Sequence, residues 1–410
     1  MNLLEDPAHR AWLEAEAERL LAFGRPSRSA IGGFGWLDNH GVVDPSHPIE
    51  LWISARMTHS YALSVLRGNA ADAALVDHGI TSLWGPLRDD AHDGWFASIG
   101  PDGPINDAKE AYGHAFVILG ASSAVAAGRP EAPALLEEAL DVFDAHFWDD
   151  EHGLARESYE ADWSGLSEYR GVNANMHTVE AYLAAADVAV RPDLLERALR
   201  ITTRVVDEWA RNNGWRIPEH FTAEWEPLLE YHRDEPAHPF RPFGATIGHL
   251  FEWSRLTLQL EASLLRAGLD APRWMVGAAR ELYDAAVRDG WNVDGAPGFV
   301  YTVDWNGAPV VRARMHWVTA EAIGAALTLW LREGDEVTAA DYESWWDYAT
   351  EYHLDRDGGS WWHELAADNT VGHSTWEGKP DVYHALQATL FPRLPITPSL
   401  ASAIKAGLLQ

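Results

Sequence analysis

Apolar residues recur at helical spacing along most of the chain, and they form two kinds of segment. In the first kind, charged residues fill the positions between apolar residues at i, i+3, i+4 and i+7, as in residues 130–148, 191–213 and 271–291. This pattern predicts amphipathic helices on the outside of the fold. The second kind, such as "AYGHAFVILGAS" at residues 111–122, is apolar and rich in small side chains. It predicts helices that are buried on all sides.

Glycines after the amphipathic segments divide the chain into units of similar length. They stand at Gly33, Gly94, Gly153, Gly214, Gly298 and Gly359, at intervals of 61, 59, 61, 84 and 61 residues. We interpret each glycine as a left-handed stop at the end of a helix, and each interval as one helical hairpin. The long fourth interval predicts an insertion at about residues 217–243.

A series of histidines runs in phase with these glycines, one near the start of each apolar segment. Its members are His59, His114, His177, His249, His316 and His384. Twelve helices in six hairpins, amphipathic alternating with apolar, predict an all-α (α/α)6 barrel, a toroid whose inner helices point their N-termini at one mouth. Alternating stretches such as "GFVYTVDWNGAPVV" at 298–311 predict short β-hairpins in the loops. We expect residues 1–410 to form one catalytic domain. An open solenoid is the alternative, and six units with similar ends favour closure.

The composition limits the kinds of partner. A net charge of −31 leaves no basic stripe for nucleic acid or an anionic membrane, and the absence of cysteine excludes disulfides and thiolate chemistry. The segment "MNLLEDPAHRAWLEAEAERLL" lacks the features of a signal peptide, and the most apolar stretch is too short to span a bilayer. We expect a cytoplasmic enzyme, monomeric or a small homo-oligomer, that acts on a small molecule without a nucleic-acid or membrane partner.

Three histidines of the series have a carboxylate one helical turn away: His177 with Glu180, His249 with Glu252, and His384 with Asp381. Such a carboxylate can fix the tautomer of an imidazole that works as an acid or base near neutral pH. It can equally form a plain hydrogen-bonded pair at a helix start. The chain contains no H-E-x-x-H, phosphate loop, dinucleotide fingerprint or G-x-S-x-G, so we expect neither a metal nor a cofactor.

Aromatic and polar residues indicate the class of ligand. Tryptophans lie at the stops and loops, namely Trp36, Trp95, Trp215, Trp305, Trp361, Trp362 and Trp376. Aromatic rings pack against the C–H faces of sugars, so the mouth is predicted to bind carbohydrate, although many of these rings can simply hold hairpins against the barrel. Arg56 stands alone in an apolar segment, and we expect it to meet a ligand or a distant carboxylate. Asn173 and Asn175 precede a buried helix, where one can serve as its N-cap.

Several long motifs resemble the N-acylglucosamine 2-epimerase superfamily and its branch of aldose–ketose isomerases. They include "GFGWLDNHG", "LWISARMTHSYAL", "EYRGVNANMHTVEAYL" and "PAHPFRPFGATIGHLFEWSRL", and the resemblance covers nearly the whole chain. It implies an (α/α)6 barrel and a metal-free 1,2-proton shift on an open-chain sugar. Carried over by position, the catalytic residues are His249 and His384, with substrate-binding residues at Arg56, Asn173, His177, Glu252, Trp317 and Trp376 and supporting residues at Glu180 and Glu321. In this scheme Glu252 orients His249.

Three positions separate the members of that branch. Sulfoquinovose isomerases have an arginine at the position of Pro239 and glutamines at the positions of His363 and Pro380, and those side chains help to hold a sulfonate. Proline offers neither a charge nor a donor, so a sugar with a plain 6-hydroxyl fits better. The resemblance thus implies interconversion of D-mannose and D-fructose, with D-lyxose as a further substrate. A mannose/glucose 2-epimerase, a sulfoquinovose isomerase, and a glycoside hydrolase using carboxylates such as Glu180, Glu252, Asp304 and Glu321 are the alternatives.

Overall fold

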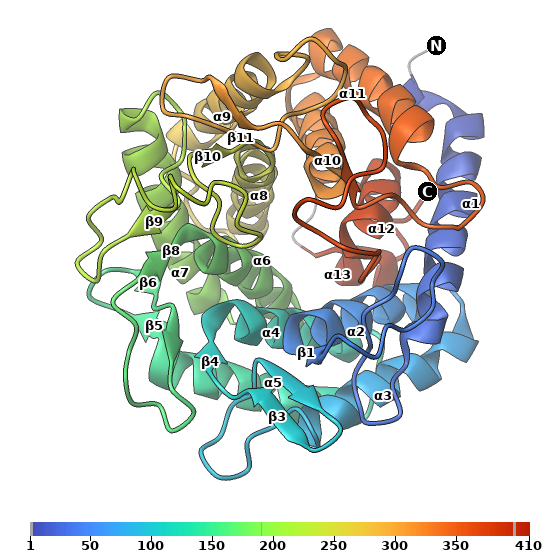
Figure 1. The fold of residues 1–410 in the computed structure, drawn as a ribbon, viewed down its shortest axis with the longest axis vertical. Coiled ribbons are helices and arrows are strands. Elements are labelled where there is room, and N and C mark those ends of the chain that lie inside the picture. The colour runs from blue at the N-terminus through green and yellow to red at the C-terminus, as the bar shows by residue number, and fades with distance from the viewer. Residues whose placement is uncertain (1–2, 190, 397–398) are drawn as a thin grey trace.

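A computed structural model describes residues 3–189, 191–396 and 399–410, and in these ranges two concentric rings of helices surround a central axis (Figure 1). The inner ring consists of α2 (Leu51–Leu66), α4 (Ala111–Ala126), α6 (Val172–Ala189), α8 (Ile247–Arg266), α10 (His316–Glu333) and α12 (Tyr383–Leu390). The outer ring consists of α1 (Pro7–Gly24), α3 (Ala73–Trp84), α5 (Ala132–Val142), α7 (Pro192–Thr202), α9 (Trp274–Gly290) and α11 (Glu336–Tyr348). The two kinds of sequence segment therefore occupy the two rings, as predicted.

Packing between neighbouring inner helices closes the ring. Each inner helix contacts the next one along the chain, and α12 returns to contact both α2 and α1. Small residues permit the close approach, because a Cβ added at Gly120 of α4 would lie 2.8 Å from the carbonyl oxygen of Ala55 in α2. The closed ring confirms the (α/α)6 barrel and excludes the open solenoid.

Outer helices are longer than their α-helical parts, since three of them continue into π-helical turns. These turns are η4 (Phe143–Phe147), η5 (Thr203–Ala210) and η6 (Ala349–His353). Short 3-10 turns complete the helical structure at η1 (Leu3–Glu5), η2 (Arg25–Ser27), η3 (Ala70–Asp72) and η7 (Phe391–Arg393). In α7, Leu194 and Ile201 are fully buried against the barrel while charged residues face outward, as amphipathic spacing requires.

Strands of two or three residues join consecutive repeats at the mouth. A strand leads directly into each of five inner helices and pairs antiparallel with a strand from the next repeat. The pairs are β1 (Ile49–Glu50) with β2 (Ser98–Gly100), β4 (Lys109–Glu110) with β7 (Ser158–Tyr159), β8 (Arg170–Gly171) with β9 (His220–Phe221), β10 (Ala245–Thr246) with β11 (Thr302–Val303), and β13 (Arg314–Met315) with β14 (Glu364–Leu365). The predicted hairpins are also present, where β2 pairs with β3 (Gly103–Asn106), β5 (Trp148–Asp149) with β6 (Leu154–Ala155), and β11 with β12 (Pro309–Val311).

The six repeat glycines have positive φ angles, between 62° and 107°, as predicted. Their position relative to the helices differs from the prediction. Only at Gly214 does the helix end beside the glycine, where the Trp215 N–H donates to the Ala210 carbonyl over 2.7 Å. The other five lie several residues farther on, as Gly298 does between the bridged residues Trp291 and Phe299 after α9. These glycines therefore form the tips of small turns, and only one of the six caps a helix.

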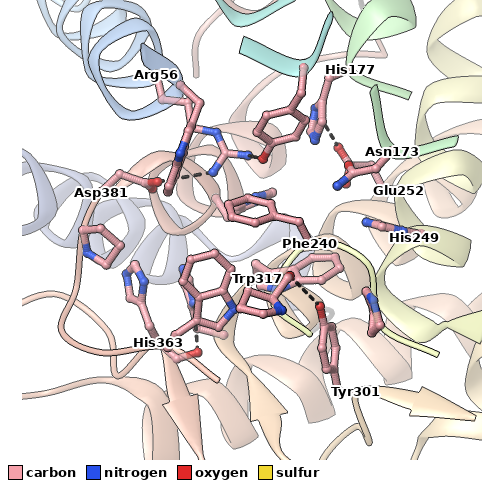
Figure 2. Close-up of a pocket in the computed structure, with 18 residues that line it drawn as sticks. Arg56, Asn173, His177, Phe240, His249, Glu252, Tyr301, Trp317, His363 and Asp381 are labelled. Carbon is pink, nitrogen blue, oxygen red and sulfur yellow. Dashed lines mark hydrogen bonds and ion pairs between the residues drawn. The ribbon is translucent and has the colours of Figure 1, made fainter. Parts of the chain in front are cut away.

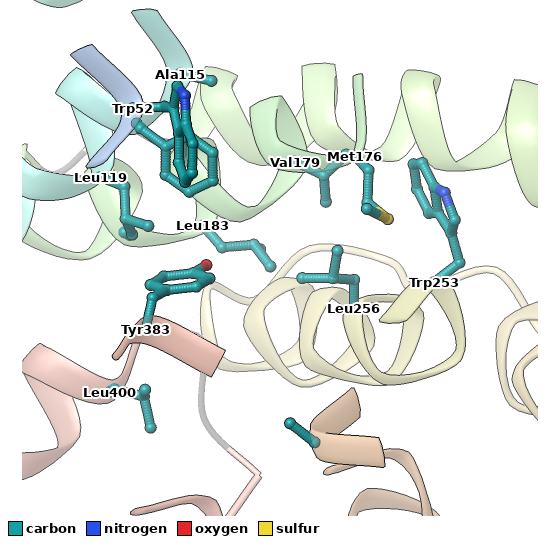
Figure 3. Close-up of a cluster of buried hydrophobic side chains, with 14 of the residues drawn as sticks. Trp52, Ala115, Leu119, Met176, Val179, Leu183, Trp253, Leu256, Tyr383 and Leu400 are labelled. Atoms are coloured by element: carbon teal, nitrogen blue, oxygen red, sulfur yellow. The ribbon is translucent and has the colours of Figure 1, made fainter. Parts of the chain in front are cut away.

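The far end of the barrel is filled by apolar side chains and by α13 (Leu400–Lys405), which packs against α2, α4 and α6. Figure 3 shows Val179 and Leu183 of α6 facing Leu256 of α8 and Tyr383 of α12, with Leu400 below them. Val179 and Leu256 are completely buried. Among the described residues, no helix combines the length and apolar character that crossing a bilayer requires.

Candidate active site

A cavity opens at the mouth, where the N-terminal halves of the inner helices converge (Figure 2). It encloses about 690 Å³ of space, including its open end. All eight predicted catalytic and substrate-binding residues line it: Arg56, Asn173, His177, His249, Glu252, Trp317, Trp376 and His384. The two predicted supporting residues, Glu180 and Glu321, lie behind this lining and bond to its histidines.

His249 bonds to a carboxylate that the sequence did not reveal. Its Nδ1 lies 2.9 Å from Oε1 of Glu219, which is buried and stands next to β9. Because a carboxylate only accepts, Nδ1–H donates to Glu219 and Nε2 remains the ring's basic nitrogen. The prediction that Glu252 orients His249 is wrong, since Glu252 faces His177 and Arg255 instead.

His384 has the same arrangement with a carboxylate from a neighbouring inner helix. Its Nδ1 lies 2.9 Å from Oε1 of Glu321 in α10, and Glu321 also accepts from Nε of Arg255 over 3.0 Å. Burial opposes ionisation of Glu321, but Arg255 and His384 outweigh it and hold the pKa of Glu321 below its usual value. Asp381, the carboxylate one turn from His384 in sequence, is not the partner of that histidine.

Asp381 instead pairs with Arg56, over 3.3 Å between Oδ2 and Nη1. The other end of the Arg56 guanidinium donates to the Tyr112 hydroxyl over 2.9 Å, and its centre lies 4.3 Å from the ring of Phe116. The expectation that this buried arginine meets a distant carboxylate is confirmed. Among the described lining residues Arg56 is the one lysine or arginine, so it supplies the fixed positive charge of the cavity wall.

Trp317 lies close to both catalytic candidates. The centre of its indole lies 5.2 Å from the His249 ring and 5.8 Å from the His384 ring. The indole packs on α8 at Gly248, where an added Cβ would lie 2.2 Å from Cζ3 of Trp317. Glycine is thus the residue that lets this flat apolar surface lie close to both imidazoles, where a sugar ring or chain can pack against it.

His177 lies across the cavity next to two carboxylates. Its Nδ1 is 3.2 Å from Glu180 and 3.9 Å from Glu252, and burial lowers its pKa to about 4, so the imidazole is neutral at physiological pH. The ligand atoms of these three side chains lie within 4.8 Å of one another, which is close enough for them to hold one metal ion together. Glu180 already accepts from His177, Tyr383 and Gln387, and Arg255 lies beside Glu252. A cation would have to displace those bonds, so the geometry favours a hydrogen-bonded network.

Residues outside the cavity take structural roles. His59 bonds to Ser123, and His114 lies between the Trp95 N–H and the Glu110 carbonyl, so four of the six histidines in the series reach the cavity. Asn175 bonds to the backbone of Ala155 and Gly171, whereas the Oδ1 of Asn173 is buried without a partner at the cavity. Asp304, a candidate for hydrolase chemistry, caps a turn at residues 304–308 outside the lining.

The loops contribute residues that share one position in the repeat. The first N–H of α6, α8 and α10 donates to the carbonyl of Glu219, Tyr301 and His363, respectively. Each of these residues follows its repeat glycine by three to five positions, which is the sequence signal that could have found Glu219 and Tyr301. The predicted insertion covers the mouth, since Pro239, Phe240 and Pro242 line the cavity and the Tyr301 hydroxyl donates to the Pro239 carbonyl over 3.3 Å.

Comparisons with known proteins agree with this geometry. Residues 32–388 match the family described as N-acylglucosamine 2-epimerase (GlcNAc 2-epimerase). A D-mannose isomerase from Thermobifida fusca is 50% identical over 401 residues, which cover 97% of both chains. A D-mannose isomerase from Pseudomonas cannabina pv. alisalensis is 49% identical over 99% of this chain and 97% of its own. A crystal structure of a D-mannose isomerase superposes with a TM-score of 0.86 at 29% identity, covering 94% of this chain and 98% of that one.

Proposed function

Because the chain belongs to the N-acylglucosamine 2-epimerase family, we propose that it is an aldose–ketose isomerase that interconverts D-mannose and D-fructose. Relatives that are 49–50% identical over nearly their whole length carry that activity in their names. One observation carries the proposal: two histidines, each with Nδ1 on a buried carboxylate, line one cavity and lie next to the same indole, that of Trp317.

In the proposed reaction the sugar ring opens first, with an acid at O5 and a base at O1. An imidazole Nε2 then removes the proton from C2 of open-chain mannose, and a cis-enediolate forms as the C1 carbonyl takes the electron pair. The hydroxyl proton of O2 then passes to O1, and the same imidazolium returns its proton to C1 as O2 becomes the carbonyl oxygen of fructose. One of His249 and His384 moves this proton, and the other assists ring opening. Glu219 and Glu321 stabilise the imidazolium that forms in either position.

Two groups on the opposite wall can hold the sugar as charge develops. The neutral imidazole of His177 donates its Nδ1–H to Glu180, so its Nε2 can accept a hydrogen bond from a sugar hydroxyl. The negative charge of the enediolate is stabilised by the guanidinium of Arg56, which Asp381 and Tyr112 hold in place. Groups fixed before the reaction stabilise developing charge without the cost of reorganising. No metal is required in this scheme.

The side chains that line the cavity also favour a neutral sugar over one that carries a sulfonate. Pro239, His363 and Pro380, the positions that differ from sulfoquinovose isomerases, all line the cavity. Burial lowers the pKa of His363 to about 3, so it brings no positive charge to this region at neutral pH. A sulfonate would therefore find no cation among these three side chains, whereas the 6-hydroxyl of mannose needs none.

The test is to incubate the protein with D-mannose and to identify the products of the wild type, His249→Ala and His384→Ala. We expect fructose from the wild type and loss of turnover in both variants with unchanged thermal unfolding. His152→Ala is a matched control, because its Nδ1 bonds to Asp149 over 2.8 Å outside the cavity. Glucose as the main product would show a 2-epimerase instead, and undiminished turnover in either cavity variant would contradict the assignment.

A further inference from the structure

Glu252 is a buried carboxyl group in the cavity wall whose Oε1 has no hydrogen-bond partner. The residue is 1% exposed, and this oxygen is one of the few buried polar atoms of the site that no donor satisfies. Figure 2 shows the side chain beside Asn173 and His177, directed toward the cavity. An ionised carboxylate in such a place would lose its hydration without gaining a bond in return.

The two neighbouring carboxylates are in the opposite situation. Glu180 accepts from Nδ1 of His177, from the hydroxyl of Tyr383 and from the amide of Gln387. Three donors of this kind favour the ionised form of Glu180. Glu321 accepts from His384 over 2.9 Å and from Arg255.

Arg255 divides its contacts unequally between two carboxylates. Its Nη2 lies 2.8 Å from Oε2 of Glu321 but 3.5 Å from Oε1 of Glu252, and its Nη1 donates to Gln259. The guanidinium of Arg255 therefore forms its closer ion pair with Glu321. Donors surround the carboxylates of Glu180 and Glu321, whereas Oε1 of Glu252 receives no hydrogen bond.

The surroundings of Glu252 also favour its protonated form. Burial and then the negative charge of Glu321 raise the pKa of Glu252 well above its usual value, whereas the donors to Glu180 outweigh burial and lower the pKa of that residue. The charged and titratable groups that face Glu252 come from each inner element around it, and are Arg56 (α2), Tyr112 (α4), His177 and Glu180 (α6), Arg255 (α8), Glu321 (α10) and Tyr383 (α12).

We propose that Glu252 works as a neutral carboxylic acid whose O–H donates a hydrogen bond to the sugar oxygen on which enediolate charge develops. This inference rests on the proposed isomerase function and gives Glu252 a role that differs from orienting His249. An ionised Glu252 would repel the enediolate, while a neutral acid in a dry wall stabilises it as an oxyanion-hole donor does. The proton stays on Glu252 throughout, so no further acid or base is needed.

Two substitutions separate a neutral donor from a carboxylate. Glu252→Gln keeps a donor of the same shape without charge, and we expect kcat on mannose to fall by no more than about tenfold, because an amide donates less strongly. Glu252→Leu keeps the volume but removes the donor, and we expect a fall of about 10²- to 10³-fold, as for loss of one oxyanion-hole donor. Equal, large losses in both variants would overturn the proposal, because they would show that the negative charge is what matters.

The pH profile gives a readout that a purely structural role would not move. Because the acid form disappears as pH rises through the folded pKa of Glu252, the wild type loses rate on the alkaline side. Glu252→Gln cannot ionise, so its alkaline limb should move to higher pH. An identical alkaline limb in the two proteins would contradict the proposal.

Infrared spectroscopy tests the protonation state without turnover. The difference spectrum of free wild type minus Glu252→Gln at pH 7 should contain the carbonyl stretch of a protonated carboxylic acid. A difference spectrum with only carboxylate bands would overturn the proposal. If the wild type does not convert mannose at all, the proposed function fails while this spectrum still tests Glu252, so the two failures are distinguishable.

Discussion

Replacing Glu219 with glutamine tests whether the carboxylate behind His249 contributes to proton transfer. Glu219 is 4% exposed, its Oε1 lies 2.9 Å from Nδ1 of His249, and it does not line the cavity. Glutamine keeps the shape and can still accept from Nδ1–H, so the tautomer is preserved. The change removes only the negative charge that stabilises the imidazolium formed when His249 takes a proton.

The expected size of the effect follows from the kind of bond. A hydrogen bond to a charged group contributes about 1.5–3 kcal/mol, and since about 1.4 kcal/mol corresponds to a tenfold change in rate, kcat should fall roughly 10- to 150-fold. The KM for mannose should change less than about threefold, because Glu219 makes no contact with the cavity and its charge matters only in the transition state.

The assay is steady-state conversion of mannose to fructose by Glu219→Gln and by the matched control Glu157→Gln. Glu157 holds the same place in its repeat, since its carbonyl accepts from the first N–H of α4 over 2.9 Å, but its carboxylate lies 3.6 Å from Arg241 and outside the cavity lining. We expect the control to keep wild-type kcat. An unchanged kcat in Glu219→Gln would refute the role of this carboxylate, and equal losses in both variants would assign the effect to the backbone of the mouth.

Four further predictions concern packing, stability and metal. Gly248→Ala places a Cβ 2.2 Å from Trp317, so KM for mannose should rise at least about tenfold through displacement of the indole, and an unchanged KM would contradict the role of this contact. Leu256→Ala removes a completely buried side chain, and urea unfolding should show a loss of about 2–5 kcal/mol; a loss under about 1 kcal/mol would show that the core is not continuous there. Burial lowers the pKa of His114 to about 3 from 6.5, so the free energy of unfolding should decrease as pH falls from about 6.5 because the unfolded chain gains the proton first; in His114→Gln this slope should be shallower, and equal slopes would contradict it. Dialysis against a chelator should leave turnover unchanged, and a loss restored by added metal would contradict the metal-free scheme.

The barrel could be predicted from the sequence because its repeat is marked by local features, namely the spacing of apolar residues in the helices and the glycines in the turns. Apolar segments alternate with amphipathic ones, and six glycines with positive φ mark the units, so closure could be inferred before any contact was known. Residues carried by the inner helices, such as His177 and His384, could be placed at the mouth for the same reason. Their helices begin there, and side chains of the first turns face the axis.

The carboxylate partners could not be predicted in the same way. His249 and Glu252 are three residues apart and share a helix face, yet the strand pair β8–β9 brings Glu219 to His249 from a loop. Asp381 likewise lies one turn from His384 in sequence but accepts from the Tyr383 N–H and pairs with Arg56, 325 residues away. Pairing between repeats depends on tertiary structure, which no helical spacing contains.

The proposed mechanism depends on one imidazole, that of His249 or His384, moving a proton between C2 and C1 of the sugar. The most direct measurement is to incubate D-mannose with the protein in D2O until many turnovers have passed, and to locate deuterium by NMR. We expect fructose as the product, with deuterium at C1 of fructose and at C2 of the recovered mannose, because a proton held by an imidazole exchanges with solvent. Fructose that contains no carbon-bound deuterium would show hydride transfer and contradict proton transfer by an imidazole.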